Sequence, residues 1–197
     1  MARALENAPE IEIESRAALE RWLEANAGQQ SGVWIVTFKK SEGSRHLPAG
    51  VIVDVALCHG WIDSLPRAKD AARTMLYLAP RKPGSNWSRV NKEKVARLEA
   101  EGRMRPGGRA AVERARADGS WTALDDVEAL KLPDDLADAL DAAPGTRAIW
   151  DGYPRSVKRG ALEQLLNAKR PETRAKRIAT ILEAARAGDR PFQWRKS

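Results

Sequence analysis

The sequence predicts an α+β fold, with a small β-sheet packed on helices in the N-terminal part and an all-helical C-terminal part. Residues 33–38 and 74–78 are rich in β-branched and aromatic side chains, a composition typical of strands. An apolar segment of helical length, residues 48–59, lies between them. Farther along the chain, apolar side chains recur at helical spacing and no strand pattern returns. We therefore expect two domains, residues 1–125 and residues 126–197.

The first elements expected are a short strand and an amphipathic helix. Residues 11–13 alternate between apolar and charged side chains, as a half-buried strand does. Ser15 is placed to cap the helix that follows, and Gly28 is expected to end it. One face of this helix carries large apolar residues, namely Leu19, Trp22 and Leu23.

Strand and helix are expected to alternate in the next segment. Residues 33–38 suit a central strand, since nearly all of their side chains are apolar. Pro48 suits the first turn of a mostly buried helix, and Gly60 is placed to end it. Residues 61–64 are expected to leave this helix in extended form, and Pro80 to end the second strand.

Helices are predicted for the remainder. Asn91 is placed to cap a helix over residues 92–101, and Pro106 to begin another that ends at Asp118. The pattern of residues 123–131 is ambiguous between helix and loop. Four further helices are expected, over residues 133–143, 146–152, 154–167 and 171–187.

The composition excludes several classes of protein. No apolar run approaches the length of a membrane-spanning helix or of a signal peptide, so we expect a cytoplasmic protein that does not insert into membranes. Cys58 is the single cysteine, which rules out an internal disulfide and a cysteine-rich metal site. Neither of the familiar glycine-rich nucleotide motifs occurs, so no cofactor is predicted. No metal is predicted either, because two histidines and one cysteine would need carboxylates to complete a zinc site. The sequence does not indicate an oligomeric state.

The positive charge is concentrated at the C-terminal end. The net charge of the chain is +7, and residues 155–197 hold twelve Lys or Arg against four Asp or Glu. This excess predicts weak, non-specific binding to polyanions through a basic surface. Its candidate residues are Lys169, Arg170, Arg174 and Arg177. Two alternatives stay open: a module that associates with nucleic acid through these helices, or a helix face that is only solvated.

Residues 80–91, Pro-Arg-Lys-Pro-Gly-Ser-Asn-Trp-Ser-Arg-Val-Asn, form the candidate ligand site. Prolines and a glycine restrict a loop that presents two cations, followed by hydroxyl and amide donors. We predict an anion site here in which Arg81 is exposed. The residues assigned to ligand binding are Trp61, Asp63, Arg81, Lys82, Ser85, Trp87 and Asn91. A structural role fits some of them equally, with Ser85 and Asn91 capping helices and Trp87 filling the core.

No catalytic residue is assigned. Cys58 lies at the expected C-terminal end of a helix, where the helix dipole does not lower a thiol pKa. His59 is its neighbour, and adjacent helical side chains diverge, so the two do not form a nucleophile and base. Cys58 is therefore expected to be a small core residue. An enzyme that uses Asp63 and a lysine as acid and base is a further alternative.

Three segments together resemble a known family. Asp-Val-Ala-Leu-Cys-His-Gly-Trp-Ile-Asp at 54–63, Ala-Pro-Arg-Lys-Pro-Gly-Ser-Asn-Trp-Ser-Arg-Val-Asn at 79–91 and Ala-Lys-Arg-Pro-Glu-Thr-Arg-Ala-Lys-Arg-Ile at 168–178 are similar to signature blocks of the YdeI/OmpD-associated family. Members are also described as bacteriocin-protection proteins. The resemblance implies a bacterial protein linked to tolerance of cationic antimicrobial peptides, with a helical C-terminal domain.

The resemblance and the loop lead to one expectation about function. We expect a non-catalytic stress-resistance protein that binds a small anionic ligand or a protein partner. A net charge of +7 opposes direct capture of cationic peptides, because like charges repel.

Overall fold

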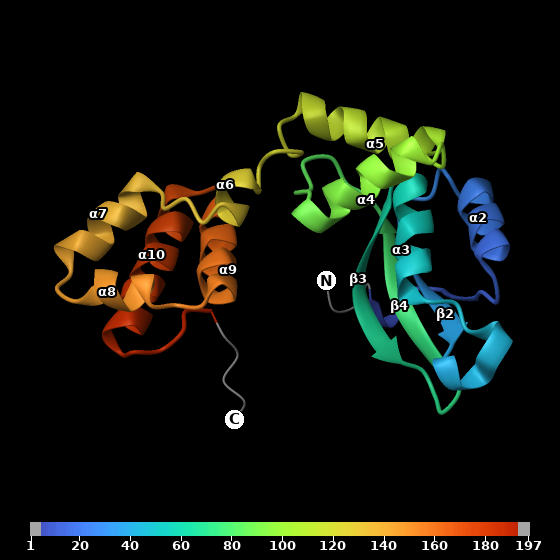
Figure 1. Ribbon diagram of the computed structural model, residues 1–197, viewed down its shortest axis with the longest axis horizontal. Coiled ribbons are helices and arrows are strands. Elements are labelled where there is room, and N and C mark those ends of the chain that lie inside the picture. The colour runs from blue at the N-terminus through green and yellow to red at the C-terminus, as the bar shows by residue number, and fades with distance from the viewer. Residues whose placement is uncertain (1–4, 193–197) are drawn as a thin grey trace. The chain divides into compact units, whose positions relative to one another are not determined.

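The computed structural model describes residues 5–192, and it confirms the α+β class. The chain divides into two compact units between Trp121 and Thr122. The first unit contains a four-stranded sheet with helices, and the described part of the second is built from helices alone (Figure 1). No helix among the described residues is both long and apolar enough to cross a membrane.

The sheet of the first unit has the strand order β1-β2-β4-β3. Its strands are β1 (Glu10–Glu12), β2 (Val33–Phe38), β3 (Trp61–Ala68) and β4 (Arg73–Pro80). The first two pair in parallel, and β4 runs antiparallel to both β2 and β3. Every residue of β2 is buried, which confirms it as a central strand. β3 continues beyond the predicted residues 61–64, because its pairing with β4 resumes after an irregularity between Asp63 and Pro66.

The helices of the first unit begin and end close to the predicted residues. They are α2 (Arg16–Ala25), α3 (Ala49–Cys58), α4 (Arg89–Ala100) and α5 (Pro106–Ala117), with a 3-10 helix η1 (Lys40–Arg45). The Ser15 hydroxyl accepts a hydrogen bond from the Ala18 N–H at 3.2 Å, so the predicted cap of α2 is confirmed.

Two predicted helix boundaries in this unit are wrong. Helix α2 ends before Gly28, because the backbone N–H and side-chain amide of Asn26 both donate to the carbonyl of Trp22. Asn91 does not cap α4. The cap is Ser88, whose hydroxyl accepts the Asn91 N–H at 3.3 Å and so places Asn91 inside the first turn.

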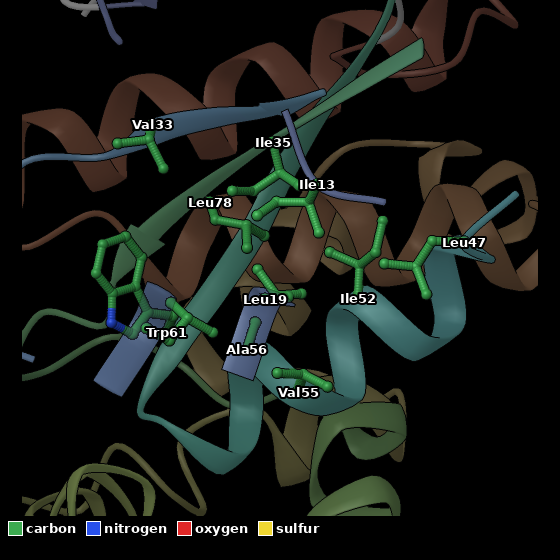
Figure 2. Close-up of a cluster of buried hydrophobic side chains, with 11 residues drawn as sticks. Ile13, Leu19, Val33, Ile35, Leu47, Ile52, Val55, Ala56, Trp61 and Leu78 are labelled. Atoms are coloured by element: carbon green, nitrogen blue, oxygen red, sulfur yellow. The ribbon is translucent and has the colours of Figure 1, made fainter. Parts of the chain in front are cut away.

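The main core of this unit lies between the sheet and the helices α2 and α3. Figure 2 shows the labelled side chains of α3 directed toward those of the strands. Trp61 belongs to this core, with 2% of its surface exposed, and its ring meets that of Trp22 edge-on at 5.7 Å. Its indole therefore fixes the start of β3 against α2.

A second core forms where α5 packs on the end of α3. A Cβ atom built on Gly108 would lie 2.2 Å from the Cys58 carbonyl oxygen, so glycine alone permits this approach. The N–H of Arg105 donates to the same carbonyl at 3.0 Å. Cys58 is 4% exposed and belongs to this core, as Trp87 does, which confirms it as a small core residue. The close contact brings α5 beside the loop that follows β4.

The described helices of the second unit agree with the predicted ones. They are α6 (Asp125–Glu128), α7 (Asp134–Ala142), α8 (Thr146–Asp151), α9 (Arg155–Leu166) and α10 (Pro171–Arg186). The short α6 resolves the ambiguous residues 123–131. The core of this unit gathers Trp150 and Tyr153 with aliphatic side chains from α7, α9 and α10.

Candidate functional site

Arg81 occupies a buried position directly after β4. Its backbone N–H donates to the Gly60 carbonyl at 2.9 Å, which anchors the chain at the end of α3. The side chain is only 6% exposed, so the expectation of an exposed arginine is wrong. The physical reason is Trp87, which is 1% exposed and receives the Arg81 guanidinium on its ring face at 3.6 Å.

The guanidinium of Arg81 is incompletely paired. Nη2 donates to the Asn86 carbonyl at 3.2 Å, whereas Nε and Nη1 have no hydrogen-bond partner among the described residues. Loss of hydration lowers the Arg81 pKa to about 10, and the nearby carboxylate of Asp63 opposes this shift. The group therefore stays protonated at neutral pH. The result is a buried positive charge with unused donors, which is the arrangement that an anion would complete.

The loop after Arg81 is held in a tight turn. The hydroxyl and the backbone N–H of Ser85 both donate to the Lys82 carbonyl, at 2.7 and 3.2 Å. Gly84 lies inside this turn with a φ of +69°, a left-handed conformation that favours glycine.

Asp118 ties this loop to the turn that follows α5. Its two carboxylate oxygens accept the N–H groups of Gly84 at 3.0 Å and Ser120 at 2.9 Å. The backbone N–H of Gly84 is therefore already engaged by a carboxylate of the chain.

A small pocket lies between the loop and α5, and we call it the Arg81 pocket. Its lining residues are Arg81, Lys82, Pro83, Gly84, Ser85, Trp87, Ala111, Arg114, Ala115, Asp118 and Ser120. The space open to the centre of a water molecule is about 10 Å³, enough for about one water. Lys82 and Arg114 are exposed and form no salt bridge within the described part of the chain, so both add positive potential here.

The structure brings together four of the seven residues predicted for ligand binding. Arg81, Lys82, Ser85 and Trp87 all line the pocket. The other three do not: Trp61 lies in the main core, Asn91 in the first turn of α4, and Asp63 acts on Arg81 only through its charge.

Helix α5 and the turn after it supply the pocket residues that sequence reasoning missed. The apolar wall comes from Ala111 and Ala115, one helical turn apart. Asp118 was interpreted only as a helix stop, although an aspartate before Gly-Ser is also typical of a side chain that accepts neighbouring N–H groups.

Trp121 contacts the ring of Trp87 but does not line the pocket. Its ring centre lies 5.0 Å from that of Trp87, with an angle of 48° between the ring planes, and the Arg116 guanidinium lies over the Trp121 ring at 5.2 Å from its centre. Arg116 is exposed and does not line the pocket. It therefore offers a matched control for Arg81, since each arginine lies over one ring of the same tryptophan pair.

The four residues predicted to form the basic surface divide into two pairs. Arg174 forms a two-pronged hydrogen bond with Asp135, at 2.5 and 2.8 Å, and thereby lowers the pKa of that carboxyl. Arg177 donates to the Gln164 carbonyl. Lys169 and Arg170 are exposed. Half of the predicted basic surface is thus engaged inside the fold.

Cys58 and His59 have shifted pKa values for the same reason. Burial raises the pKa of the Cys58 thiol and lowers that of the His59 imidazole, because it disfavours the charged form of each. The thiol is therefore protonated at neutral pH. No group of three or more His, Cys, Asp or Glu side chains suited to a metal ion occurs within residues 5–192.

Two family models match the chain, and each match lies within a different unit. Residues 11–111 match the family described as Domain of unknown function (DUF8412). Residues 129–188 match the family described as Bacteriocin-protection, YdeI or OmpD-Associated. Neither the search of curated proteins nor that of solved structures found a significant match.

The matches confirm the predicted resemblance for the C-terminal part. Residues 168–178 lie inside the bacteriocin-protection match, whereas residues 54–63 and 79–91 lie inside the other. The residues that the loop contributes to the Arg81 pocket, and Ala111 of α5, therefore fall in the first match, which covers just over half of the 197 residues. The chain belongs to the DUF8412 family, and its C-terminal part carries a segment of the bacteriocin-protection, YdeI or OmpD-associated type.

Proposed function

We propose that this chain is a non-catalytic bacterial resistance protein that acts in the cytoplasm against bacteriocin or antimicrobial-peptide stress by binding an anion in the Arg81 pocket. The match of residues 129–188 supports the protective role. The observation that carries the binding is the buried Arg81 guanidinium, with two nitrogens that lack a partner among the described residues.

The energetics of burial favour an anionic ligand. A buried donor without a partner costs about 1–3 kcal/mol, and a charged group costs more. Trp87 and Asp63 offset part of this cost, but neither supplies an acceptor to Nε or Nη1 of Arg81. An anion that accepts these N–H groups would remove the penalty, and Lys82 and Arg114 would attract it.

The charge of the whole protein argues for an indirect mode of protection. A net charge of +7 repels cationic peptides, so the partner of the pocket is an anion rather than the peptide itself. The protein would then act on a cellular component that such peptides affect.

Anion binding is tested by thermal denaturation of the full chain with a panel of inorganic and organic anions. We expect ligand-dependent stabilisation of the wild type and of Arg116→Met, and none of Arg81→Met. Methionine keeps an apolar side chain on the Trp87 ring but removes the charge. An equal shift in all three proteins, or no shift in any, would contradict binding at Arg81.

The protective role needs a separate test in cells. The wild type, Arg81→Met and Arg116→Met would be expressed to equal levels in a bacterium that is sensitive to a cationic bacteriocin. Survival should rise with the wild type and with Arg116→Met only. If the wild type gives no protection, the role is wrong even if the pocket binds anions.

A further inference from the structure

We infer that the ligand of the Arg81 pocket is a carboxylate, carried either by a small acid or by the end of a peptide. This inference rests on the proposed function and names the chemistry of its anion. One carboxylate oxygen enters the pocket against Arg81, and the other stays on the exposed side, toward Lys82 and Arg114. Three features of the pocket lead to this assignment.

The first feature is size. A space of about 10 Å³ for a water centre accepts one oxygen atom, not the four oxygens of a phosphate or sulfate. Enlarging it means moving Trp87, Ala111 or Ala115, which belong to a close-packed core. A flat carboxylate that inserts one oxygen leaves only one more oxygen outside the pocket, whereas a phosphate that inserts one leaves three to be placed against the same residues.

The second feature is charge. Arg81 is the one buried cation of the pocket, and Asp63 already opposes part of its charge. The carboxylate of Asp118 lines the same pocket and repels a second negative charge. A monoanion is therefore favoured over a dianion.

The third feature is the placement of donors. Asp118 engages the N–H groups of Gly84 and Ser120, so the unpaired buried donors on the residues that line the pocket are Nε and Nη1 of Arg81 and the hydroxyl of Ser120. Lys82 and Arg114 lie at the exposed side of the same wall. A ligand with two oxygens on one carbon reaches both regions, whereas a single halide ion reaches only one.

The test measures affinities of the full chain by calorimetric titration in chloride-free buffer. The probes are acetate, benzoate, chloride, phosphate and one short peptide with either a free or an amidated C-terminus. We expect a carboxylate to bind at least about tenfold more tightly than phosphate or chloride. If the source is a peptide end, the peptide with a free C-terminus should bind more tightly than its amide and than acetate or benzoate. If the source is a small acid, acetate or benzoate should bind at least as tightly as the free peptide.

Variants and spectroscopy assign the binding to this pocket. Arg81→Met should abolish carboxylate binding and Lys82→Met should weaken it, whereas Arg116→Met should leave it unchanged. If Arg81→Met does not fold, the Nε–H resonance of Arg81 in the wild type, identified with Arg81→Lys, should shift when acetate is added. A resonance that does not move would overturn the site.

The outcomes separate this inference from the function on which it rests. If phosphate or chloride binds through Arg81 more tightly than the carboxylates do, the assignment of a carboxylate ligand is wrong, but the proposal of anion binding stands. Absence of any Arg81-dependent binding would overturn both.

Discussion

The guanidinium carbon of Arg81 lies 3.6 Å from the centre of the Trp87 ring, and both side chains are buried. The pair closes the loop after β4, because Arg81 also donates to the carbonyl of Asn86, next to Trp87. Arg81 thus packs like an apolar side chain while it keeps its charge in the pocket. This double role explains why its removal should affect both folding and binding.

Arg81→Ala should destabilise the protein by about 1–3 kcal/mol, because it removes the packing on Trp87 and leaves a void in the loop. This corrects the view from the sequence, in which an exposed arginine contributes little. Urea denaturation of the wild type and the variant measures the difference. Arg116→Ala is the control and should stay within about 0.5 kcal/mol, since Arg116 is exposed. An equal loss of unfolding free energy in the two variants would show that the burial of Arg81 does not determine its contribution to stability.

Gly108→Ala should be strongly destabilising because its Cβ would lie 2.2 Å from the Cys58 carbonyl oxygen. Forcing α5 away from α3 should cost about 1–3 kcal/mol, the usual range for overpacking. The shift of α5 would also move Ala111 and Ala115, so anion binding should weaken. The measurement is the free energy of unfolding from denaturant titrations.

Gly160→Ala in α9 is the matched control for that substitution. Apart from its chain neighbours and the backbone of its own helix, no atom lies within 4 Å of the Cβ that it would add, and alanine is favoured over glycine in a helix by about 0.5–1 kcal/mol. It should leave stability equal or higher. A loss as large as that of Gly108→Ala would point to a general cost of alanine at these positions rather than to the contact with Cys58.

Local signals in the sequence predicted the elements well. The Ser15 cap, the apolar β2 and the prolines near the starts of α3 and α5 act within a few residues, so their outcome does not depend on the rest of the fold. The cap of α4 was misplaced because Ser88 and Asn91 are both good caps three residues apart. Nothing local decides between them.

The pocket was predicted only in part because its other wall comes from a distant segment. Arg81 and Trp87 are close in sequence, and proline and glycine between them indicated a loop. Burial of Arg81 depends on α5, which Gly108 allows to pack against Cys58. Periodicity reveals that α5 has an apolar face, but it does not say what that face covers. The sequence likewise does not show what the Trp61 ring covers. It was predicted to bind ligand, whereas it packs on Trp22 in the main core.

Asp135→Asn should lower stability at neutral pH and have little effect in acid. Arg174 lowers the pKa of Asp135, so the folded state holds the carboxylate more strongly than the unfolded state does. The stabilisation is full above the ordinary aspartate pKa of about 3.9 and is lost as the pH falls through the lower folded value. The pair is partly exposed, so the loss at pH 7 should be about 1 kcal/mol or less.

Urea denaturation at neutral pH and near pH 2 checks this dependence. Asp134→Asn is the control, since Asp134 is exposed and forms no salt bridge within residues 5–192. The difference between wild type and Asp135→Asn should shrink on acidification, and the difference for Asp134→Asn should stay small throughout. If the wild type remains more stable than Asp135→Asn by the same amount in acid, the effect comes from packing instead of charge.

Weak binding to polyanions should depend on Lys169 and Arg170 rather than on Arg174 and Arg177. The first two are exposed, whereas the side chains of the other two are held by Asp135 and the Gln164 carbonyl. A free cation that contacts a phosphate releases a counterion, so each should contribute about one to the slope of log affinity against log salt. The measurement is a fluorescence titration of labelled duplexes of several sequences at two salt concentrations.

The double variant Lys169→Ala/Arg170→Ala should bind more weakly with a shallower slope. Lys131→Ala, at an exposed lysine paired with Asp126, is the control and should bind as the wild type does. Tight binding of one duplex sequence that survives added salt would instead favour a module that reads nucleic acid, because charge alone does not distinguish bases.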